Sequence, residues 1–209
     1  MHKFKLIVGC LTAMIALGAV SVSSASAAQW FVGGAALVGS SEISPTTKTV
    51  ENSVLSGGGE TVECTGLTEP TGKKALITAP NAGSAEALLF TGCKSTTAGC
   101  KISAESITTN GVTTKTETVA GTETKTVFKT TNPENIFAKI KFEVGCPVAG
   151  NLNVKGEKLT TTDPNGATES AEQALNVNST TELKLGANAA TLKGKSKLKL
   201  VSGANWSFH

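Results

Sequence analysis

Strict alternation of apolar and polar side chains marks two segments of the chain as strands. Between residues 136 and 144 the even positions are Ile, Ala, Ile, Phe and Val, and the odd ones include Lys139, Lys141 and Glu143. Between residues 192 and 200 the even positions are Leu, Gly, Ser, Leu and Leu, and Lys occupies every odd position. Side chains of a strand alternate between its faces, so each segment buries one face and solvates the other. Half-solvated strands of this kind are typical of antiparallel sheets.

Nine further segments have the composition and the turn-forming flanks of strands, with weaker alternation. They are residues 29–32, 48–55, 60–64, 74–78, 85–91, 101–108, 152–158, 174–178 and 181–185. Many short strands at fairly even spacing predict an all-β fold, an antiparallel β-sandwich with a small β-barrel as the alternative. Trp30 and Trp206 are expected to fill the core where the first and last strands meet. The one segment with a helix-forming composition is 169–175.

A Thr-rich segment, residues 111–131, departs from this pattern because both of its faces are polar near its middle. Ala120 and Gly121 can turn the segment back on itself as a hairpin in which Val119 pairs with Thr122. In that register each face near the tip carries a mixture of Thr, Lys and Glu. Since neither face can pack on an apolar core, we expect a Thr-rich hairpin that protrudes into solvent.

The first 28 residues have the parts of a secretory signal peptide. Lys3 and Lys5 form a short positive region, an apolar run extends from residue 6 to 20, and small residues end in an A-x-A motif at 25–27. This run is too short to span a bilayer as a helix. We therefore expect cleavage after residues 1–28, a secreted protein that can associate with the cell envelope, no transmembrane segment after cleavage, and a single β-domain over residues 29–209.

Four cysteines lie beyond the leader, and an even number in an exported chain predicts disulfides. Cys93 and Cys100 flank a short loop and can pair locally, which leaves Cys64 to pair with Cys146. The alternative joins Cys64 to Cys93 and Cys100 to Cys146, and the sequence does not decide between the two schemes. A zinc site is disfavoured because no two cysteines have C-x-x-C spacing.

Charge and residue types argue against several classes of function. The chain has 19 Lys, no Arg and two His, and beyond the leader 17 Lys face 16 acidic residues. A nearly neutral chain without Arg is not expected to bind nucleic acid. His209, the last residue, is the one His beyond the leader, so a Ser or Cys nucleophile has no positioned base. We predict a protein that is not an enzyme, with no catalytic residue, no metal and no cofactor.

Short motifs at both ends of the expected domain carry a resemblance. They are WFVGG at 30–34, VEC at 62–64, LFTGC at 89–93 and SGANW at 202–206. With these motifs the chain resembles a set of exported, β-rich, uncharacterised proteins of soil actinobacteria. The resemblance spans most of the expected domain and departs from it in the middle, around the Thr-rich segment and Cys146. It implies a secreted β-domain and carries no activity, substrate or site residue.

The sharpest surface feature is a row of lysines at alternate positions, Lys193, Lys195, Lys197 and Lys199, which we call the Lys row. Its ammonium groups repeat about every 7 Å along a strand and can contact an anionic polymer. A solvated strand face protected from pairing with other chains has the same pattern.

Two functional hypotheses follow from these features. The leading hypothesis is a non-catalytic extracellular binding or structural module at the cell envelope, with an anionic polymer or an extracellular protein as partner. The alternative hypothesis is a carrier that holds a small apolar ligand in the interior of a β-barrel.

Overall fold

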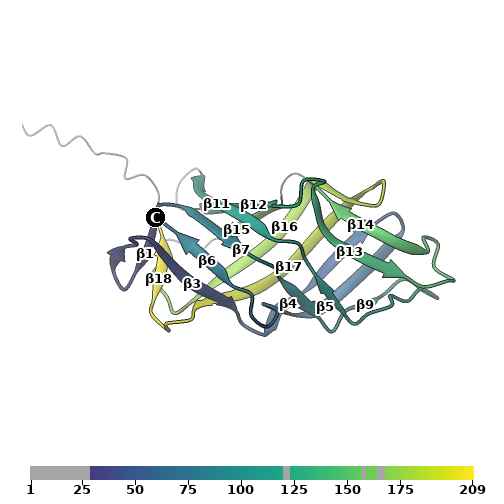
Figure 1. Cartoon of the computed structure of the whole chain (residues 1–209), viewed down its shortest axis with the longest axis horizontal. Helices are drawn as coiled ribbons and strands as arrows, with labels where there is room; N and C mark the ends of the chain where they lie inside the picture. The colour runs from purple at the N-terminus through teal and green to yellow at the C-terminus, as the bar shows by residue number, and fades with distance from the viewer. Residues whose placement is uncertain (1–28, 120–122, 157–158, 164–167) are drawn as a thin grey trace, which may run out of the picture.

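The computed structural model describes residues 29–119, 123–156, 159–163 and 168–209, and the regular structure in these ranges is β-strand (Figure 1). The expected signal peptide and the expected turn at 120–121 lie outside the described residues. In the ranges that are described, no helix has the length and hydropathy needed to cross a bilayer. The prediction of an all-β, antiparallel sandwich is confirmed, since all the named strand pairs are antiparallel.

The strands alternate with short turns along the whole described chain. In chain order they are β1 (Trp30–Val32), β2 (Ala35–Ala36), β3 (Ser40–Pro45), β4 (Lys48–Gly57), β5 (Glu60–Thr68), β6 (Ala75–Thr78), β7 (Ala82–Ala85), β8 (Leu89–Thr91), β9 (Lys94–Ser95), β10 (Ser106–Thr108), β11 (Val112–Val119), β12 (Glu123–Thr130), β13 (Ile136–Phe142), β14 (Gly150–Lys155), β15 (Leu159–Asp163), β16 (Glu172–Leu185), β17 (Asn188–Leu200) and β18 (Trp206–Phe208).

The two longest strands, β16 and β17, form a hairpin that runs through the middle of the molecule (Figure 1). β17 pairs with β16 on one side and with β3 and β4 on the other. The far side of β16 pairs with β14 and β15. The hairpin is therefore shared by two groups of strands. We call them the terminal lobe (β3, β6, β7, β11, β12 and β15) and the disulfide lobe (β4, β5, β8, β10, β13 and β14).

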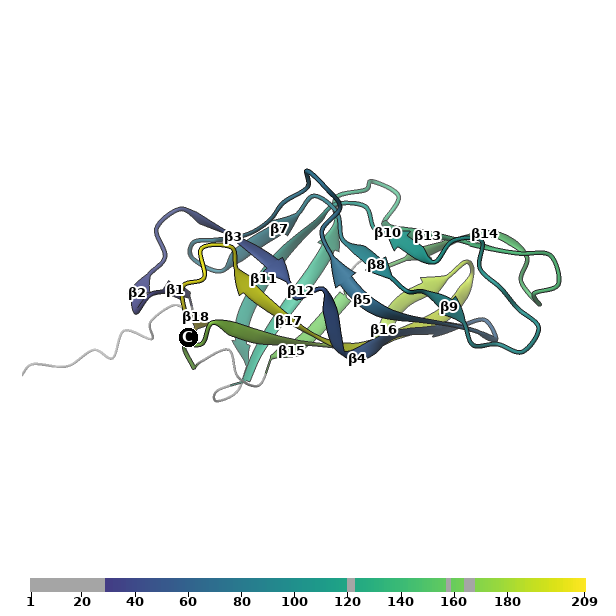
Figure 2. The same cartoon turned by 90° about the horizontal axis from the view of Figure 1, so that it is seen from below.

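Each lobe is a sandwich whose two layers are joined by strand pairs. In the terminal lobe the pairs lead from β17 through β3, β6, β7, β11, β12 and β15 to β16. In the disulfide lobe the strand pairs lead from β17 through β4, β5 and β8 to β10. The isolated bridges Ile102–Phe142 and Thr109–Ala138 connect this layer to β13. Figure 2 shows the lobes at opposite ends of the shared hairpin.

A separate three-stranded sheet, β18-β1-β2, brings the first and last described strands together. Trp30 lies opposite Phe208 in this sheet, with their ring centroids 4.7 Å apart, and the Trp30 centroid lies 5.8 Å from that of Trp206. These rings pack with Ile77 and Leu200 in a buried cluster at the end of the terminal lobe. The prediction that both tryptophans fill the core where the first and last strands meet is confirmed.

The disulfides join Cys64 to Cys93 and Cys100 to Cys146. The alternative connectivity is therefore correct, and the local Cys93–Cys100 pairing is wrong. The reason lies in β9, which pairs with β5 so that Lys94 is opposite Glu63. Because the two strands are antiparallel, this register places Cys64, which follows Glu63, beside Cys93, which precedes Lys94.

The Thr-rich segment forms the predicted hairpin, but the paired part of the hairpin lies within the sheet instead of protruding from it. Val119 is opposite Glu123 rather than Thr122, so the register differs by one residue from the predicted one. β7 pairs with the outer edge of β11, and β15 pairs with the outer edge of β12. Thr116 and Thr126 face inward, where a hydrogen bond of 2.9 Å between their hydroxyls allows both to be buried.

Two predictions are wrong near the ends of strands, one at the end of β13 and one at the start of β16. The alternation in residues 136–144 is interrupted at Phe137, which is buried where the pairing register shifts between Ile136 and Ala138. From Ala138 it holds as far as Phe142, where β13 ends, and Val144 beyond it is 99% exposed. Residues 169–175 do not form a helix, because β16 begins at Glu172 and pairs with β17 from there on.

Candidate functional site

The interior of the molecule contains two apolar cavities, one in each lobe. The terminal cavity has a volume of about 70 Å³ and the disulfide-lobe cavity about 100 Å³. The two cavities adjoin each other, because four side chains line both of them: Leu67, Leu88, Phe128 and Leu175. A movement of one of these shared side chains would connect the two spaces.

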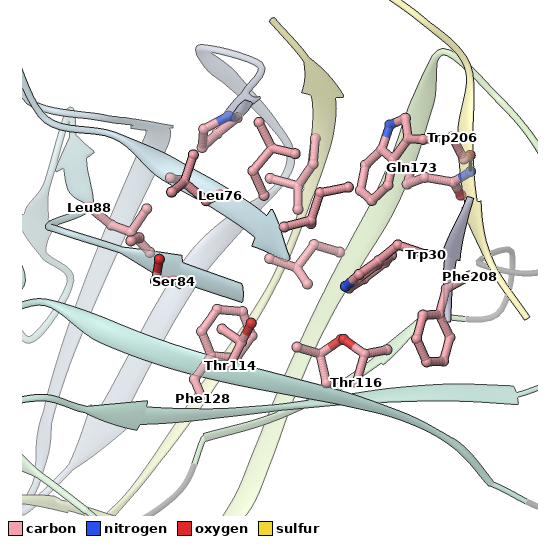
Figure 3. Close-up of a pocket in the computed structure, with 18 of the residues that line it drawn as sticks. Trp30, Leu76, Ser84, Leu88, Thr114, Thr116, Phe128, Gln173, Trp206 and Phe208 are labelled. Carbon is pink, nitrogen blue, oxygen red and sulfur yellow. Dashed lines mark hydrogen bonds between the residues drawn. The ribbon is translucent and has the colours of Figure 1, made fainter. Parts of the chain in front are cut away.

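The terminal cavity is closed at one end by aromatic rings. Trp30, Trp206 and Phe208 lie together at this end, and Leu88 lies at the other (Figure 3). All three rings are at least nine-tenths buried. Trp30 belongs to β1, and Trp206 and Phe208 belong to β18. The three-stranded sheet therefore positions the end wall of the cavity.

Several polar groups of the terminal cavity wall have hydrogen-bond partners within the protein. The Gln173 amide Nε2 donates to the Trp206 carbonyl at 2.5 Å and to the Thr168 carbonyl at 2.8 Å. The Trp30 indole Nε1 donates to the Ala82 carbonyl at 2.9 Å. The Thr116 and Thr126 hydroxyls bond each other. The indole Nε1 of Trp206 is buried with no hydrogen-bond partner among the described residues. The hydroxyl-bearing side chains of Ser84 and Thr114 also line this wall.

The disulfide-lobe cavity has a wall of aliphatic and aromatic side chains from both layers of its sandwich. Val62, Ile107, Ala138 and Ile140 lie on this wall and are all at least nine-tenths buried. The Cys64–Cys93 disulfide borders the same space through Cys64. The disulfide therefore helps to hold β5 in the position that shapes the cavity.

Neither cavity has a charged side chain among its described lining residues. Elsewhere in the described ranges, no three His, Cys, Asp or Glu side chains converge as metal ligands would. An ionised ligand would lose its hydration in such a wall without gaining a counter-charge. The chemistry of the interior therefore favours a neutral, largely apolar molecule.

The Lys row lies on the outer face of β17. Lys193, Lys197 and Lys199 are exposed and Lys195 is half-buried, while the even residues between them face inward. Leu192 and Ser196 line the disulfide-lobe cavity, and Leu198 lines the terminal cavity. The alternation predicted for residues 192–200 is thus confirmed, with the Lys row on one face and the cavity wall on the other.

Acidic side chains on neighbouring strands offset the positive charge of the Lys row. Lys197 forms an ion pair of 2.8 Å with Glu172, which is also opposite Lys199 in the register of β16 and β17. Lys195 is opposite Glu51 of β4. Exposed pairs like these contribute little to stability, but they lower the net potential that a polyanion would meet.

Ion pairing continues on β3 and β6 of the terminal lobe. A hydrogen bond of 2.9 Å to Glu42 raises the pKa of Lys74 above its usual value. The effect is confined to an exposed pair on the surface, away from both cavities. It gives neither cavity an ionisable group.

Glu60, at the start of β5, is 1% exposed, and neither of its carboxylate oxygens has a hydrogen-bond partner among the described residues. A buried charge without a partner destabilises the folded state. We expect Glu60→Gln to raise the free energy of unfolding at pH 7 by about 1 kcal/mol or more, because the amide has no charge to desolvate.

Urea unfolding of the variant and the wild type measures this difference. The matched control is Glu51→Gln, at an exposed position of β4, which should change the free energy of unfolding by about 0.5 kcal/mol or less. A loss of stability in Glu60→Gln would show that the carboxylate is stabilised by an interaction that the amide cannot make.

Sequence reasoning located the strands around the cavities but not the cavities themselves. The sequence predicts a solvated hairpin for the Thr side chains of β11 and β12, and nothing in the spacing of Trp206 indicates an unpartnered indole. The pairing of Thr116 with Thr126 depends on a register that differs by one residue from the predicted one. Comparisons of the chain with family models, curated proteins and solved structures find no match.

Proposed function

We propose that this chain is an exported, non-catalytic binding protein that takes a small apolar molecule into its interior. The observation that carries the proposal is the pair of adjoining apolar cavities with no charged side chain on their described walls. An apolar cavity of about 150 Å³ can hold a molecule the size of benzene. Neither space alone reaches this volume, but the two together reach it once they are connected, so the ligand is a small ring or a short chain that occupies both.

The location of the Lys row supports this choice over the envelope-binding hypothesis. The row is solvated, and Glu172 and Glu51 lie next to its members on the adjacent strands. This is the environment of a strand face kept soluble by mixed charge. Export is proposed from the signal-peptide pattern, and two disulfides are compatible with an oxidising compartment.

Thermal unfolding in the presence of benzene tests the proposal. A ligand at about ten times its Kd raises the free energy of unfolding by about 1.4 kcal/mol. For a chain of this size we expect the Tm to rise by about 3–6 °C. A Tm that stays constant up to the solubility limit of benzene would contradict the proposal.

Variants that fill each cavity show where the ligand binds. Ala85 lines the terminal cavity and Ala138 the disulfide-lobe cavity, and each is 7% exposed. Ala85→Leu or Ala138→Leu should reduce the benzene-induced rise in Tm, because the added carbons occupy the space of the ligand. Lys197→Gln, on the outer face, should leave the rise unchanged. An undiminished rise in both Leu variants would show that benzene binds elsewhere.

A further inference from the structure

The two layers of the disulfide lobe meet without a strand pair along one boundary, between residues 102–109 and residues 138–142, which we call the seam. In the described ranges, every named strand pair around the two lobes has at least two successive residue pairs in register. The seam instead has an isolated bridge at each end, Ile102–Phe142 and Thr109–Ala138. Figure 2 shows β10 next to β13 at this boundary.

The middle of the seam cannot form a regular ladder, because its two sides differ in length. Between the two bridges, residues 103–108 on one side face residues 139–141 on the other. The surplus residues must leave the ladder, and β10 pairs with β8 on its far side. A backbone hydrogen bond of 2.9 Å from Ser103 N to Lys141 O belongs to the bridge at one end. The seam is therefore held mainly at its ends.

This unpaired stretch forms part of the wall of the disulfide-lobe cavity. Ile107 on one side of the seam and Ile140 on the other both line the cavity and are at least nine-tenths buried. Local opening requires less free energy where few backbone hydrogen bonds must break. Separation of the two sides at this point would open an apolar passage into the cavity.

The Cys100–Cys146 disulfide ties one end of the seam. Cys100 precedes Ile102 and Cys146 follows Phe142, so this bond crosses from one side of the seam to the other. The Cys64–Cys93 disulfide does not cross it, because it lies where β5 pairs with β9 in a single layer. The Cys100–Cys146 bond therefore limits how far the seam can separate.

The terminal cavity has no comparable boundary among the described strands. The strand pairs of its lobe lead without interruption from β17 round to β16. The rings of Trp30, Trp206 and Phe208 close its end. A molecule that enters the disulfide-lobe cavity can reach the terminal cavity when a side chain that lines both, such as Phe128, moves aside.

We propose that the seam is the entrance through which a small, neutral, apolar ligand reaches the interior, and that the Cys100–Cys146 disulfide restrains its opening. This inference rests on the proposed function, because it describes how the ligand of the same two cavities enters and leaves. Entry and exit both require the seam to open, so the disulfide controls the rates of binding and not the affinity.

Amide hydrogen exchange tests the opening of the seam without any ligand. In the wild type, the amides of residues 102–109 should exchange at least about tenfold faster than the amides in the middle of β16 and β17. Replacement of Cys100 and Cys146 by Ala should accelerate exchange in the seam further. Exchange in the wild-type seam that is as slow as in the shared hairpin would overturn the proposal, a result that does not depend on the folding of any variant.

The rates of benzene binding test whether the opening is the entrance. NMR exchange between free and bound benzene gives both rates. We expect Cys100→Ala with Cys146→Ala to raise the association and dissociation rates about tenfold or more, with a Kd within about twofold of the wild type, since neither cysteine lines a cavity.

Leu185→Ala is the matched control, because Leu185 is buried where β16 pairs with β14 and lines neither cavity. It should lower the stability of the same lobe without accelerating benzene exchange. Benzene rates that do not change when the disulfide is removed, or that rise equally in Leu185→Ala, would overturn the entrance but retain the apolar site. Failure of the wild type to bind benzene would overturn the proposed function and the entrance together.

Discussion

Replacement of all four paired cysteines by Ala is expected to leave the chain unfolded at room temperature. The bonds Cys64–Cys93 and Cys100–Cys146 span sequence separations of 29 and 46 residues. Closing loops of these lengths restricts the unfolded chain by about 3.5 and about 4 kcal/mol in the chain-entropy model. Their combined loss is comparable with the whole stability of an ordinary domain, about 5–15 kcal/mol.

Circular dichroism and urea unfolding measure the effect, and the variants with one bond removed provide the comparison. Cys64→Ala with Cys93→Ala, and Cys100→Ala with Cys146→Ala, should each fold with a lower urea midpoint. The first pair is the more deeply buried, so its removal also loses packing around the disulfide-lobe cavity. A fourfold variant that unfolds cooperatively at the wild-type midpoint would contradict the prediction.

Phe142→Ala is expected to lower the free energy of unfolding by about 3–5 kcal/mol. Phe142 is 2% exposed and belongs to the larger buried cluster, where truncation removes apolar contacts and leaves a cavity. Urea unfolding measures the loss, and it should appear as a lower midpoint with little change in the slope of the transition.

Val144→Ala is the matched control for this change. It lies two residues further along the same alternating pattern, but its side chain is 99% exposed. We expect a change of about 0.5 kcal/mol or less. A large loss at Val144 would mean that the strand continues to that residue and buries it, as the sequence pattern alone had predicted.

The contrast between these two residues shows what periodicity can predict. Alternation assigns inner and outer faces correctly where a strand is regularly paired, as in β13 from Ala138 to Phe142 and along the Lys row. It fails at Phe137, which is buried beside a shift of register. It cannot say where pairing stops, because that depends on the partner strand. The described pairs between β14 and β13 end with Gly150 opposite Phe142, and Val144, beyond that pair, is 99% exposed.

The Thr-rich hairpin shows a second limit. Thr was treated as polar, so a segment with Thr on both faces was expected in solvent. In the sheet, Thr116 and Thr126 are directly opposite and their hydroxyls bond each other, which allows both side chains to be buried. The signal for burial is a cross-strand pair, and such a pair is visible only once the register is known.

The disulfide connectivity and the cavities depend on contacts between strands distant in the sequence. The sequence predicted that the four cysteines pair, and left two schemes open. The choice was made by the pairing of β9 with β5. The cavities likewise arise where two layers meet around shared residues such as Phe128 and Leu175, a property that no local pattern encodes.

The shared hairpin also determines the order in which the chain can fold. β16 and β17 cover residues 172–200, and both lobes use them to complete their layers. The end wall of the terminal cavity also requires β18, which pairs with β1. Neither lobe can therefore reach its final structure during synthesis until residues 172–200 have been made. Such late, long-range closure makes folding slow and keeps the growing chain open.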